Sequence, residues 1–270
     1  MEITLTGKVA IITGAARGIG FSIASFFAES GASVIIADID AVKGKDAAVV
    51  ISAKGYICEY KKIDLSKPLS FETFVEEIFQ KYKRIDILVN NARAGGKFGL
   101  QDENIRNWLL TTNVVLTSSF FLSQNVIKKM SKLNSGVILN ISSVAGILAT
   151  PESPSYHAAK GGLISLTKYL AVEAGAYGIR VNSILPGFIV QDQHIEFFSS
   201  QANSSYRQII ETYQPGGKVG TENDVAEAAL FLCSDNARYI SGESLVLDGA
   251  ATVQEQSGLS LKIQDQIKNG

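Results

Sequence analysis

The residues of this chain best suited to acid–base chemistry are a tyrosine and a lysine four positions apart. In the stretch "SYHAAK", Tyr156 and Lys160 fall on the same face of a helix. A tyrosine hydroxyl titrates near pH ~10, so it acts as a general base only where a nearby cation favours the phenolate. Lys160 can supply that cation. The pair predicts a proton acceptor, although such pairs also occur on solvated helix faces.

A serine upstream of this pair can bind a substrate oxygen. Ser143 lies in "NISSVAG", at the end of an apolar run, which is where open α/β sheets bind ligands. Its hydroxyl can donate a hydrogen bond to a developing alkoxide or a carbonyl oxygen. A cap at the strand end is the structural alternative. His157 points about 100° away from the tyrosine at helical spacing and is expected to pack or to lie on the surface.

A glycine-rich stretch predicts a site for a dinucleotide. "TGAARGIG" (13–20) directly follows an apolar run and opens a helical segment. Gly14 permits a tight turn, Gly18 lets the backbone approach a pyrophosphate, and Gly20 lets the helix pack on the strand. The N–H groups at the start of that helix are free to bind phosphate. A glycine-rich turn without a ligand is the alternative.

The second apolar run ends in a carboxylate that bears on the choice of cofactor. Asp38 lies where an acidic residue accepts both ribose hydroxyls and repels a 2′-phosphate, which favours NAD over NADP. Its neighbours in sequence supply no cation, but Arg17 in the glycine loop could reach a 2′-phosphate. A helix cap or a solvated turn acid is the structural alternative for Asp38.

The elements that must position these residues alternate along the chain. Short apolar runs rich in β-branched residues are separated by longer segments with apolar residues at three-to-four spacing, such as 68–82 and 155–178. This alternation predicts a doubly wound (Rossmann) α/β fold: one domain with a mostly parallel, seven-stranded sheet and helices on both faces. The expected strands are 8–13, 33–38, 55–60, 86–90, 136–142, 179–185 and 243–248.

Composition excludes several classes of partner. The formal net charge is −1, with 25 basic and 26 acidic residues, so the sequence gives no sign of binding nucleic acid or a membrane surface. No apolar stretch approaches the ~18 residues of a membrane span, and the N-terminus does not resemble a signal peptide. The two cysteines form no metal-binding pattern, and no metal is expected. A cytoplasmic location follows as the expectation.

One long connection and the tail complete the organisation. Residues 188–217 lack a strand signal and are expected to form a lid over the active site, whereas 251–270 form a polar extension, either disordered or docked on a neighbouring subunit. The lid mixes polar and aromatic residues, which suits a sugar, a polyol or a sugar acid. Gln191 and His194 are its candidate substrate residues.

An arginine follows the fourth expected strand, in "VNNARAGG" (89–96). Mobile arginines in turns are commonly solvated. At the ligand-binding edge of the sheet, however, the planar guanidinium of Arg93 would suit a carboxylate or phosphate on the substrate. Both interpretations stay open from the sequence.

Taken together, these motifs resemble the short-chain dehydrogenase/reductase family, in its standard form of about 250 residues. The resemblance covers residues 5–250 and adds "IDLS" (63–66), "NNA" (90–92), "TTNVVL" and "LPGFIV" (185–190), in the order of the family. The chain departs from it at Arg93, where glycine is usual, and at Gln191-Asp192, where a threonine that binds the carboxamide is common. The cofactor-binding residues that the resemblance implies are Gly14, Arg17, Gly18, Ile19, Gly20, Asp38, Asp64, Leu65, Asn91, Ala92, Tyr156, Lys160, Pro186, Gly187 and Ile189.

The resemblance also implies a mechanism and an assembly. Tyr156 exchanges the alcohol proton, Ser143 binds the substrate oxygen, and Lys160 lowers the pKa of the tyrosine and binds the nicotinamide ribose. Asn113 holds a water through which protons reach solvent. The family usually forms homotetramers through helices that match 103–131 and 155–178.

Four functions remain open from the sequence. The first is an NAD-dependent oxidoreductase that interconverts a polar secondary alcohol and a ketone. The second is a 3-oxoacyl-[acyl-carrier-protein] reductase that uses NADPH. The closing segments "GKVGTENDVAEAALFLCSD" (217–235) and "ISGESLVLDGA" (240–250) also resemble that enzyme. The third is a catalytically silent nucleotide-sensing protein, and the fourth is a structural subunit of a larger assembly. The filled catalytic positions favour the two enzymes.

Overall fold

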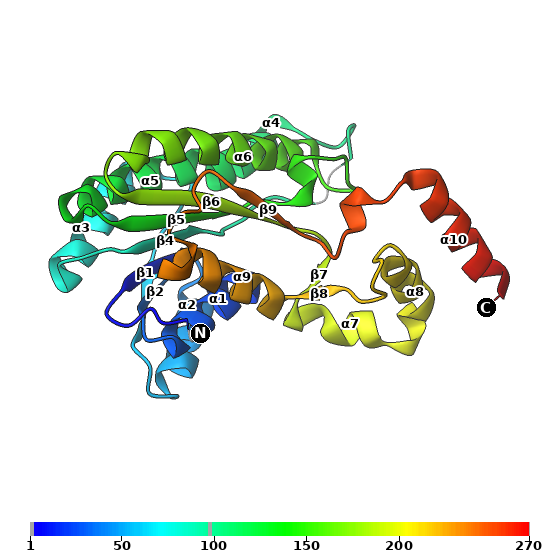
Figure 1. Cartoon of the computed structure of the whole chain (residues 1–270), viewed down its shortest axis with the longest axis horizontal. Coiled ribbons are helices and arrows are strands. Elements are labelled where there is room, and N and C mark those ends of the chain that lie inside the picture. Colours follow the sequence, from blue (N-terminus) through cyan, green and yellow to red (C-terminus); the bar gives the residue numbers. More distant parts are fainter. Residues whose placement is uncertain (1–2, 97–98, 270) are drawn as a thin grey trace.

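The computed structural model describes residues 3–96 and 99–269, and its centre is the expected parallel sheet (Figure 1). Its seven strands pair in the order β3-β2-β1-β4-β5-β6-β9, each parallel to its neighbour. This is a single Rossmann-like domain, so the predicted fold class is confirmed. The strands are β1 Val9–Thr13, β2 Ser33–Asp38, β3 Cys58–Lys62, β4 Ile87–Asn90, β5 Gly136–Ile141, β6 Ile179–Pro186 and β9 Ser244–Leu247.

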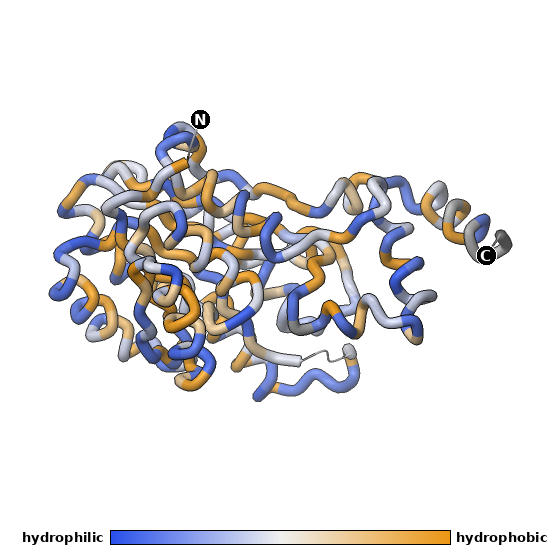
Figure 2. The backbone as a smooth tube through the Cα atoms, turned by 90° about the horizontal axis from the view of Figure 1, so that it is seen from below, coloured by the Kyte–Doolittle hydropathy of each residue, from blue (hydrophilic) through white to orange (hydrophobic). Residues whose placement is uncertain are grey.

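Helices cover both faces of the sheet. On one face α1, α2 and α9 pack over a core that includes Ile12, Phe27 and Val225. On the other face α3, α5 and α6 enclose a second core around Phe71 and Leu122, and α4 lies against α6. In Figure 2 the body of the molecule, which holds the sheet, carries most of the apolar stretches of backbone. The helices are α1 Gly18–Glu29, α2 Ala41–Ser52, α3 Phe71–Tyr82, α4 Ile105–Thr112, α5 Ser118–Met130, α6 Pro154–Gly175 and α9 Glu222–Cys233.

The strand order brings the sequence motifs to one edge of the sheet. The order in which successive strands are added to the sheet reverses at β1. β2 and β3 lie on one side of β1, and β4 and the later strands lie on the other. The carboxyl ends of β1 and β4 therefore form the crevice in which open α/β sheets bind ligands. The glycine loop follows β1, Asn91 and Arg93 follow β4, and Ser143 follows β5.

The structure corrects several boundaries. β3 begins at Cys58, not at residue 55, because Gly55 lies in a turn and Ile57 is exposed at the start of this edge strand. The expected long helix over 103–131 is α4 and α5 joined by a π-helical turn, Asn113–Thr117.

The long connection contains regular structure that its sequence did not predict. It includes a two-residue strand, β7 Ile189–Val190, which pairs in parallel with β8 Gly220–Thr221. It also includes the short helices α7 Ile195–Ser199 and α8 Ser204–Thr212. The tail forms a helix, α10 Gln256–Asn269, which extends away from the sheet beyond α8 (Figure 1).

A network of buried side-chain hydrogen bonds ties the sheet to two helices beneath the site. Asn90 Nδ2 donates to Asn140 Oδ1 at 2.9 Å and to Ser123 Oγ at 3.1 Å, and Asn140 Nδ2 donates to Thr167 Oγ1 at 2.9 Å. All four residues are buried. The network links β4 and β5 to α5 and α6, and each buried polar group depends on its neighbour for a partner.

Replacing Asn140 with alanine should lower the free energy of unfolding by about 2–3 kcal/mol, because the amide of Asn90 and the hydroxyl of Thr167 each lose a buried partner. The measurement is urea denaturation followed by circular dichroism. Asn125→Ala is the control, since Asn125 lies on α5, outside the network, and its amide donates to the carbonyl of Phe121 in its own helix. A loss in N140A no larger than that in N125A would contradict a supporting role for the network.

Candidate active site

The predicted catalytic residues meet at the carboxyl edge of the sheet. Ser143 follows β5, and Tyr156 and Lys160 lie on the first turns of α6, which Ser153 caps by accepting a hydrogen bond from the amide of Tyr156. Ser143 forms a hydrogen bond with the Tyr156 side chain, which acts to lower the pKa of the phenol. Its Oγ also accepts a hydrogen bond from the amide of Ala145 at 3.1 Å, so Ser143 caps the following turn as well.

Lys160 is the most deeply buried charge of the site. Its side chain reaches under the Tyr156 ring, with Nζ 5.5 Å from the ring centroid, and donates a hydrogen bond to the carbonyl of Ile141 at 2.6 Å. The residue is 3% exposed. Burial, with a smaller effect of Arg93, lowers the pKa of Lys160 to about 7. Because the unfolded chain binds this proton more tightly, the burial of Lys160 opposes folding below about pH 7, and this effect fades as the pH rises towards the ordinary pKa.

Tyr156 is subject to opposing influences. Burial is the largest and raises its pKa, and the charge of Glu152 raises it further. Arg93 and the hydrogen bond from Ser143 act in the opposite direction. The net direction is upward, so the phenol needs a further source of positive charge before it can act as a base near neutral pH.

Asn113 begins the π-helical turn that separates α4 from α5. Its carbonyl accepts a hydrogen bond from the amide of Ser118, five residues on, and its Oδ1 accepts one from Thr117 Oγ1 at 3.4 Å. The turn packs against α6, which carries Tyr156 and Lys160. Such π-helical turns occur frequently at functional sites.

The glycine loop has the shape that a pyrophosphate requires. A Cβ on Gly20 would lie 2.4 Å from the carbonyl oxygen of Gly14 and 2.5 Å from Asn91 Nδ2, so only glycine lets the loop close on itself. Helix α1 starts at Gly18, and its cap residue, Arg17, makes no side-chain hydrogen bond to the first turn. Arg17 therefore does not occupy the first N–H groups of α1 with its side chain, and the loop fits a dinucleotide.

Other predicted cofactor residues gather around this loop. The Asp38 carboxylate accepts hydrogen bonds from the amides of Ala16 and Asp40, each at 3.0 Å, and keeps lone pairs for further donors. The pairing of β2 with β3 places Lys62 opposite Asp38, a cation that the sequence analysis missed because it is 24 residues away in the chain. Asn91 Nδ2 donates to the carbonyls of Thr13 and Gly14.

The remaining cofactor candidates line the neighbouring strand ends. Asp64 accepts hydrogen bonds from Ser66, which lower its pKa, and Leu65 is buried beside it. Ala92 contacts the glycine loop, since a Cβ on Gly14 would lie 2.7 Å from its Cα. At the end of β6, Pro186 is buried and Gly187 lies against Asp248, whereas Ile189 belongs to β7, and Ile19 is in the first turn of α1.

Of the three candidate substrate residues, one lies at Tyr156, one at the glycine loop and one on the surface. Arg93 lies over the Tyr156 ring, with its Cζ 5.1 Å from the ring centroid. Gln191 lies against the glycine loop, because a Cβ on Gly18 would be 2.8 Å from its Oε1. His194 is exposed at the start of α7. His157 packs as expected: its Nε2 accepts a hydrogen bond from the amide of Thr150 at 2.9 Å, which fixes the loop before α6.

Two carboxylates near the site, one half-buried and one buried, carried no signal in the sequence. Glu152 lies in the loop before α6, and its Oε2 is 3.7 Å from Nη2 of Arg93. Glu222, at the start of α9, accepts a hydrogen bond from the amide of Asp192 in the long connection at 3.3 Å. Burial, with a smaller effect of Asp192, raises the pKa of Glu222. Neither residue belongs to a recurring spacing, so only the folded chain identifies them.

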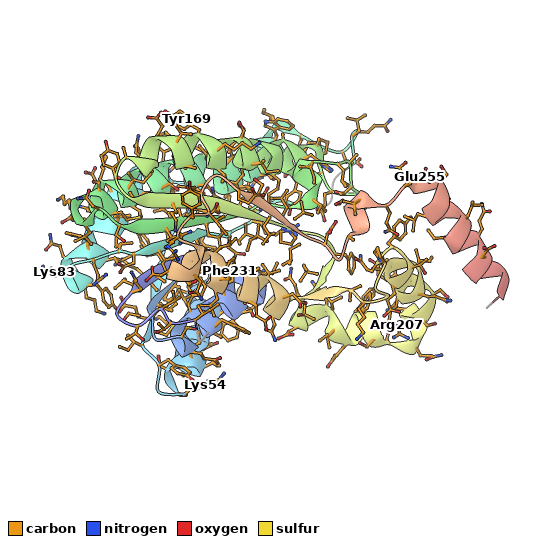
Figure 3. The ribbon with its side chains drawn as sticks, in the orientation of Figure 1. Lys54, Lys83, Tyr169, Arg207, Phe231 and Glu255 are labelled. Carbon is orange, nitrogen blue, oxygen red and sulfur yellow. The ribbon has the colours of Figure 1, made fainter. Side chains whose placement is uncertain are left out.

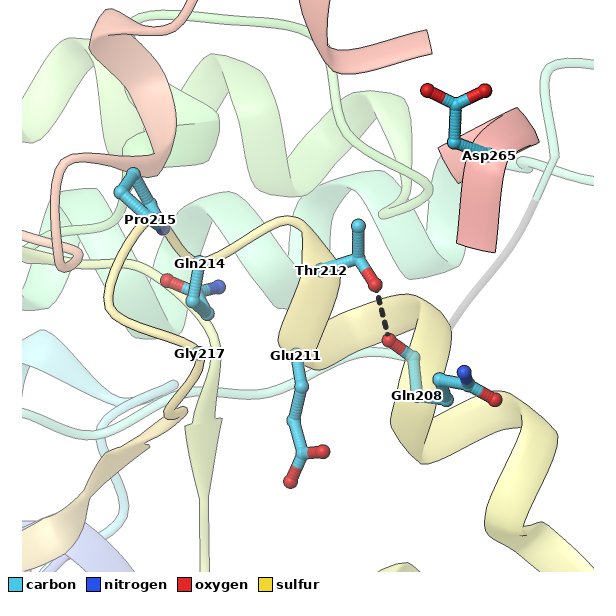
Figure 4. Close-up of a pocket in the computed structure, with 7 residues that line it drawn as sticks. All are labelled: Gln208, Glu211, Thr212, Gln214, Pro215, Gly217 and Asp265. Atoms are coloured by element: carbon cyan, nitrogen blue, oxygen red, sulfur yellow. Dashed lines mark hydrogen bonds between the residues drawn. The ribbon is translucent and has the colours of Figure 1, made fainter. Parts of the chain in front are cut away.

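Two hollows in the described residues lie apart from the catalytic cluster. One, of about 520 Å³, separates α8 from α10 and is lined by polar residues such as Glu211, Gln214 and Asp265 (Figure 4). The other, of about 440 Å³, lies at the amino-terminal ends of β4, β5 and β6, at the opposite edge of the sheet.

Among residues 3–96 and 99–269, no group of three or more His, Cys, Asp or Glu side chains is placed to hold a metal ion. Within the same residues, each helix is too short or too polar to cross a membrane.

Comparison with known proteins gives the family. The model of the family described as enoyl-(acyl carrier protein) reductase matches residues 14–252. The 3-oxoacyl-[acyl-carrier-protein] reductase of Chlamydia trachomatis is 39% identical over 246 residues, which cover 91% of this chain and 97% of that protein. The NAD-dependent glycerol dehydrogenase of Listeria innocua is 34% identical over 253 residues, covering 94% and 97%.

A solved structure agrees with these relatives. The crystal structure of a protein from Sinorhizobium meliloti, provisionally assigned as a short-chain alcohol dehydrogenase, has a TM-score of 0.86 and 30% sequence identity. The match covers 94% of this chain and 99% of that one. The fold and the relatives agree, and the chain belongs to the short-chain dehydrogenase/reductase family of NAD(P)-dependent oxidoreductases.

Proposed function

We propose that the protein is an NAD-dependent oxidoreductase that interconverts a secondary alcohol and a ketone, and that its substrate is a small, polar, hydroxylated molecule. The observation that carries the reaction is the cluster of Ser143, Tyr156 and Lys160 beside the glycine loop. Asp38 supports NAD, since its carboxylate stands at the end of β2 beside that loop. Similarity to a glycerol dehydrogenase supports a polyol.

In this proposal each side chain handles a proton or an oxygen atom. Ser143 donates a hydrogen bond to the substrate oxygen, and Tyr156 takes the proton of the alcohol or returns it to the ketone. A bound nicotinamide supplies the acceptor or donor of the hydride. The Lys160 ammonium stabilises the phenolate of Tyr156 and binds the ribose of the cofactor. Asn113 holds a water that passes protons to solvent.

The cofactor is proposed to lie along the glycine loop. Its pyrophosphate binds at the start of α1, its adenine near Asp64 and Leu65, and its nicotinamide near Pro186, Gly187 and Ile189. The lid formed by residues 188–217 closes over it, and 251–270 form an extension outside the domain of residues 1–250.

A 3-oxoacyl-[acyl-carrier-protein] reductase is the second candidate. Several relatives carry that name, including one at 39% identity. Such an enzyme would use NADPH. Arg17 in the glycine loop and Lys62, which pairs with Asp38 across the sheet, are cations that would favour a 2′-phosphate. The two candidates therefore differ in cofactor as well as in substrate.

Replacing Tyr156 with phenylalanine tests the catalytic proposal. The variant should lose about 1000-fold in kcat with any alcohol that the wild type oxidises, because the proton acceptor is removed. Binding of NADH, followed by its fluorescence, should stay within about twofold, since the ring remains in place. Unchanged turnover would exclude Tyr156 as the base. A wild-type protein that binds NADH but turns over no alcohol or ketone would instead be a nucleotide sensor.

Replacing Asp38 with asparagine tests the cofactor proposal. The wild type should have at least about a tenfold higher kcat/KM for NAD than for NADP, and the variant should narrow this ratio about tenfold because the repulsion of a 2′-phosphate is removed. Asp40→Asn is the control, since Asp40 lies two residues away and caps α2 through the amide of Lys43. A wild-type preference for NADP would support the reductase instead.

We also propose that the chain forms homotetramers. The outer sides of α4, α5 and α6 expose large apolar side chains, among them Trp108, Phe121 and Val172, and Tyr169 points outward from α6 (Figure 3). Light scattering at micromolar concentration should give four times the chain mass of 28.9 kDa. Val172→Glu should dissociate the assembly, whereas Val49→Glu, at an exposed site on α2, should not. A monomeric wild type would contradict the proposal.

A further inference from the structure

A pair of opposite charges lies beside the catalytic tyrosine. Arg93 follows β4, and Glu152 lies in the loop between β5 and α6, four residues before Tyr156. The guanidinium of Arg93 lies over the Tyr156 ring, with Cζ 5.1 Å from its centroid, and its Nη2 is 3.7 Å from Glu152 Oε2. The charges of both residues act on the Tyr156 hydroxyl. The pair therefore borders the space that a substrate of Tyr156 must enter.

Within the described part of the chain, one oxygen of this carboxylate has no hydrogen-bond donor. Oε2 of Glu152 is buried and accepts no hydrogen bond from the described residues, since Nη2 of Arg93 is too distant for one. The ion pair holds the carboxylate in place, while the side chain remains 21% exposed. A largely buried carboxylate without a donor is costly, because buried acceptors normally find a partner. The geometry calls for a donor from a bound molecule.

The guanidinium of Arg93 has N–H donors that can bind an acceptor on a ligand. The Arg93 side chain is 49% exposed, and its contacts with Glu152 and the Tyr156 ring leave N–H groups free to donate. A hydroxyl group is both a donor and an acceptor, so one hydroxyl can bridge the pair. It would donate to the carboxylate of Glu152 and accept from the guanidinium of Arg93.

Other ligand groups fit the pair less well. A carboxylate or phosphate would accept from Arg93, but Glu152 already balances that charge and would repel a second anion. A thioester or an alkyl chain offers no donor and would leave the carboxylate of Glu152 desolvated and unpaired. The pair thus favours a neutral substrate with a second hydroxyl near the reacting one.

We propose that Arg93 and Glu152 form a specificity site that binds a second hydroxyl next to the alcohol at Tyr156, so that the substrate class is a vicinal diol or polyol. The inference rests on the proposed function, because it assumes that Tyr156 and Ser143 bind the reacting oxygen. It assigns Glu152 a role in choosing the substrate and Arg93 a role as its partner, in place of a site for an anion.

The test compares three secondary alcohols of similar size: butan-2-ol, butane-2,3-diol and 3-hydroxybutanoate. NAD and NADP are each supplied, and kcat/KM is measured by nicotinamide absorbance. The wild type should prefer the diol over butan-2-ol by about 10- to 100-fold, the range that a hydrogen bond to a charged group gives. 3-Hydroxybutanoate should fall below the diol.

Variants of Glu152 test whether this residue causes the preference for the diol. Glu152→Met should remove most of the preference for the diol over butan-2-ol, and Glu152→Gln, which keeps an acceptor, should retain part of it. The ratio of the two substrates is the readout, because a change in the pKa of Tyr156 alters both rates alike. Dissociation constants of the two alcohols, from quenching of bound NADH, should change in the same sense. Glu72→Gln, at an exposed site on α3, is the matched control and should leave the ratio unchanged.

Each contrary outcome has a distinct meaning. Equal turnover of butan-2-ol and the diol by the wild type, or an unchanged ratio in Glu152→Met, would overturn the inference and leave the proposed reaction intact. A preference for 3-hydroxybutanoate that Arg93→Ala abolishes would overturn it in favour of an anion site. Lack of turnover of all three alcohols with both cofactors would overturn the proposed function and this inference together.

Discussion

The burial of one ammonium group, that of Lys160, is the constraint on which the active site depends. In the described residues its hydrogen bond goes to a neutral carbonyl, that of Ile141, and no ion pair with a carboxylate includes it. Burial lowers its pKa to about 7. A phenolate at Tyr156 would favour the charged lysine, and the charged lysine would favour the phenolate. In the proposed mechanism each group would therefore depend on the charge of the other.

The proposed roles of Tyr156 and Lys160 require that β5 and α6 hold a fixed position relative to each other. Lys160 and Tyr156 lie on α6, whereas the carbonyl that binds Lys160 and the serine that binds Tyr156 belong to the end of β5 and the turn after it. Ser142 strengthens this junction, since its Oγ donates to the carbonyl of Lys160 at 2.9 Å. Deeper down, the hydrogen bond from Asn140 to Thr167 joins the same strand to the same helix. Buried polar groups, which are costly when unpaired, thus fix the spacing of the proposed catalytic residues.

The sequence predicted the parts of this arrangement that leave a local pattern. Parallel strands buried on both faces read as apolar runs, and the glycine loop and the Tyr156–Lys160 spacing each lie within one short segment. β3 starts later than predicted because it is an edge strand of half-buried residues, and β7 is too short to show a period. Lys62 and Glu152 escaped prediction for another reason. They approach Asp38 and Arg93 only through the pairing of strands and the path of a loop.

The proposed cofactor side and substrate side of the crevice also differ in how much of each could be predicted from the sequence. The cofactor side consists largely of backbone, in the glycine loop and the start of α1, so the reaction class follows from glycines and strand order. The substrate side consists of side chains from separate loops. There the charges of Arg93 and Glu152 act on the pKa of Tyr156 in opposite directions, and Arg93 has the larger effect. A single charge at the substrate side of the crevice would change the pKa of Tyr156 as well as select the substrate. Because Glu152 opposes part of the effect of Arg93 on the pKa of Tyr156, the proposed pair can bind a hydroxyl and disturb the titration of Tyr156 less than Arg93 alone would.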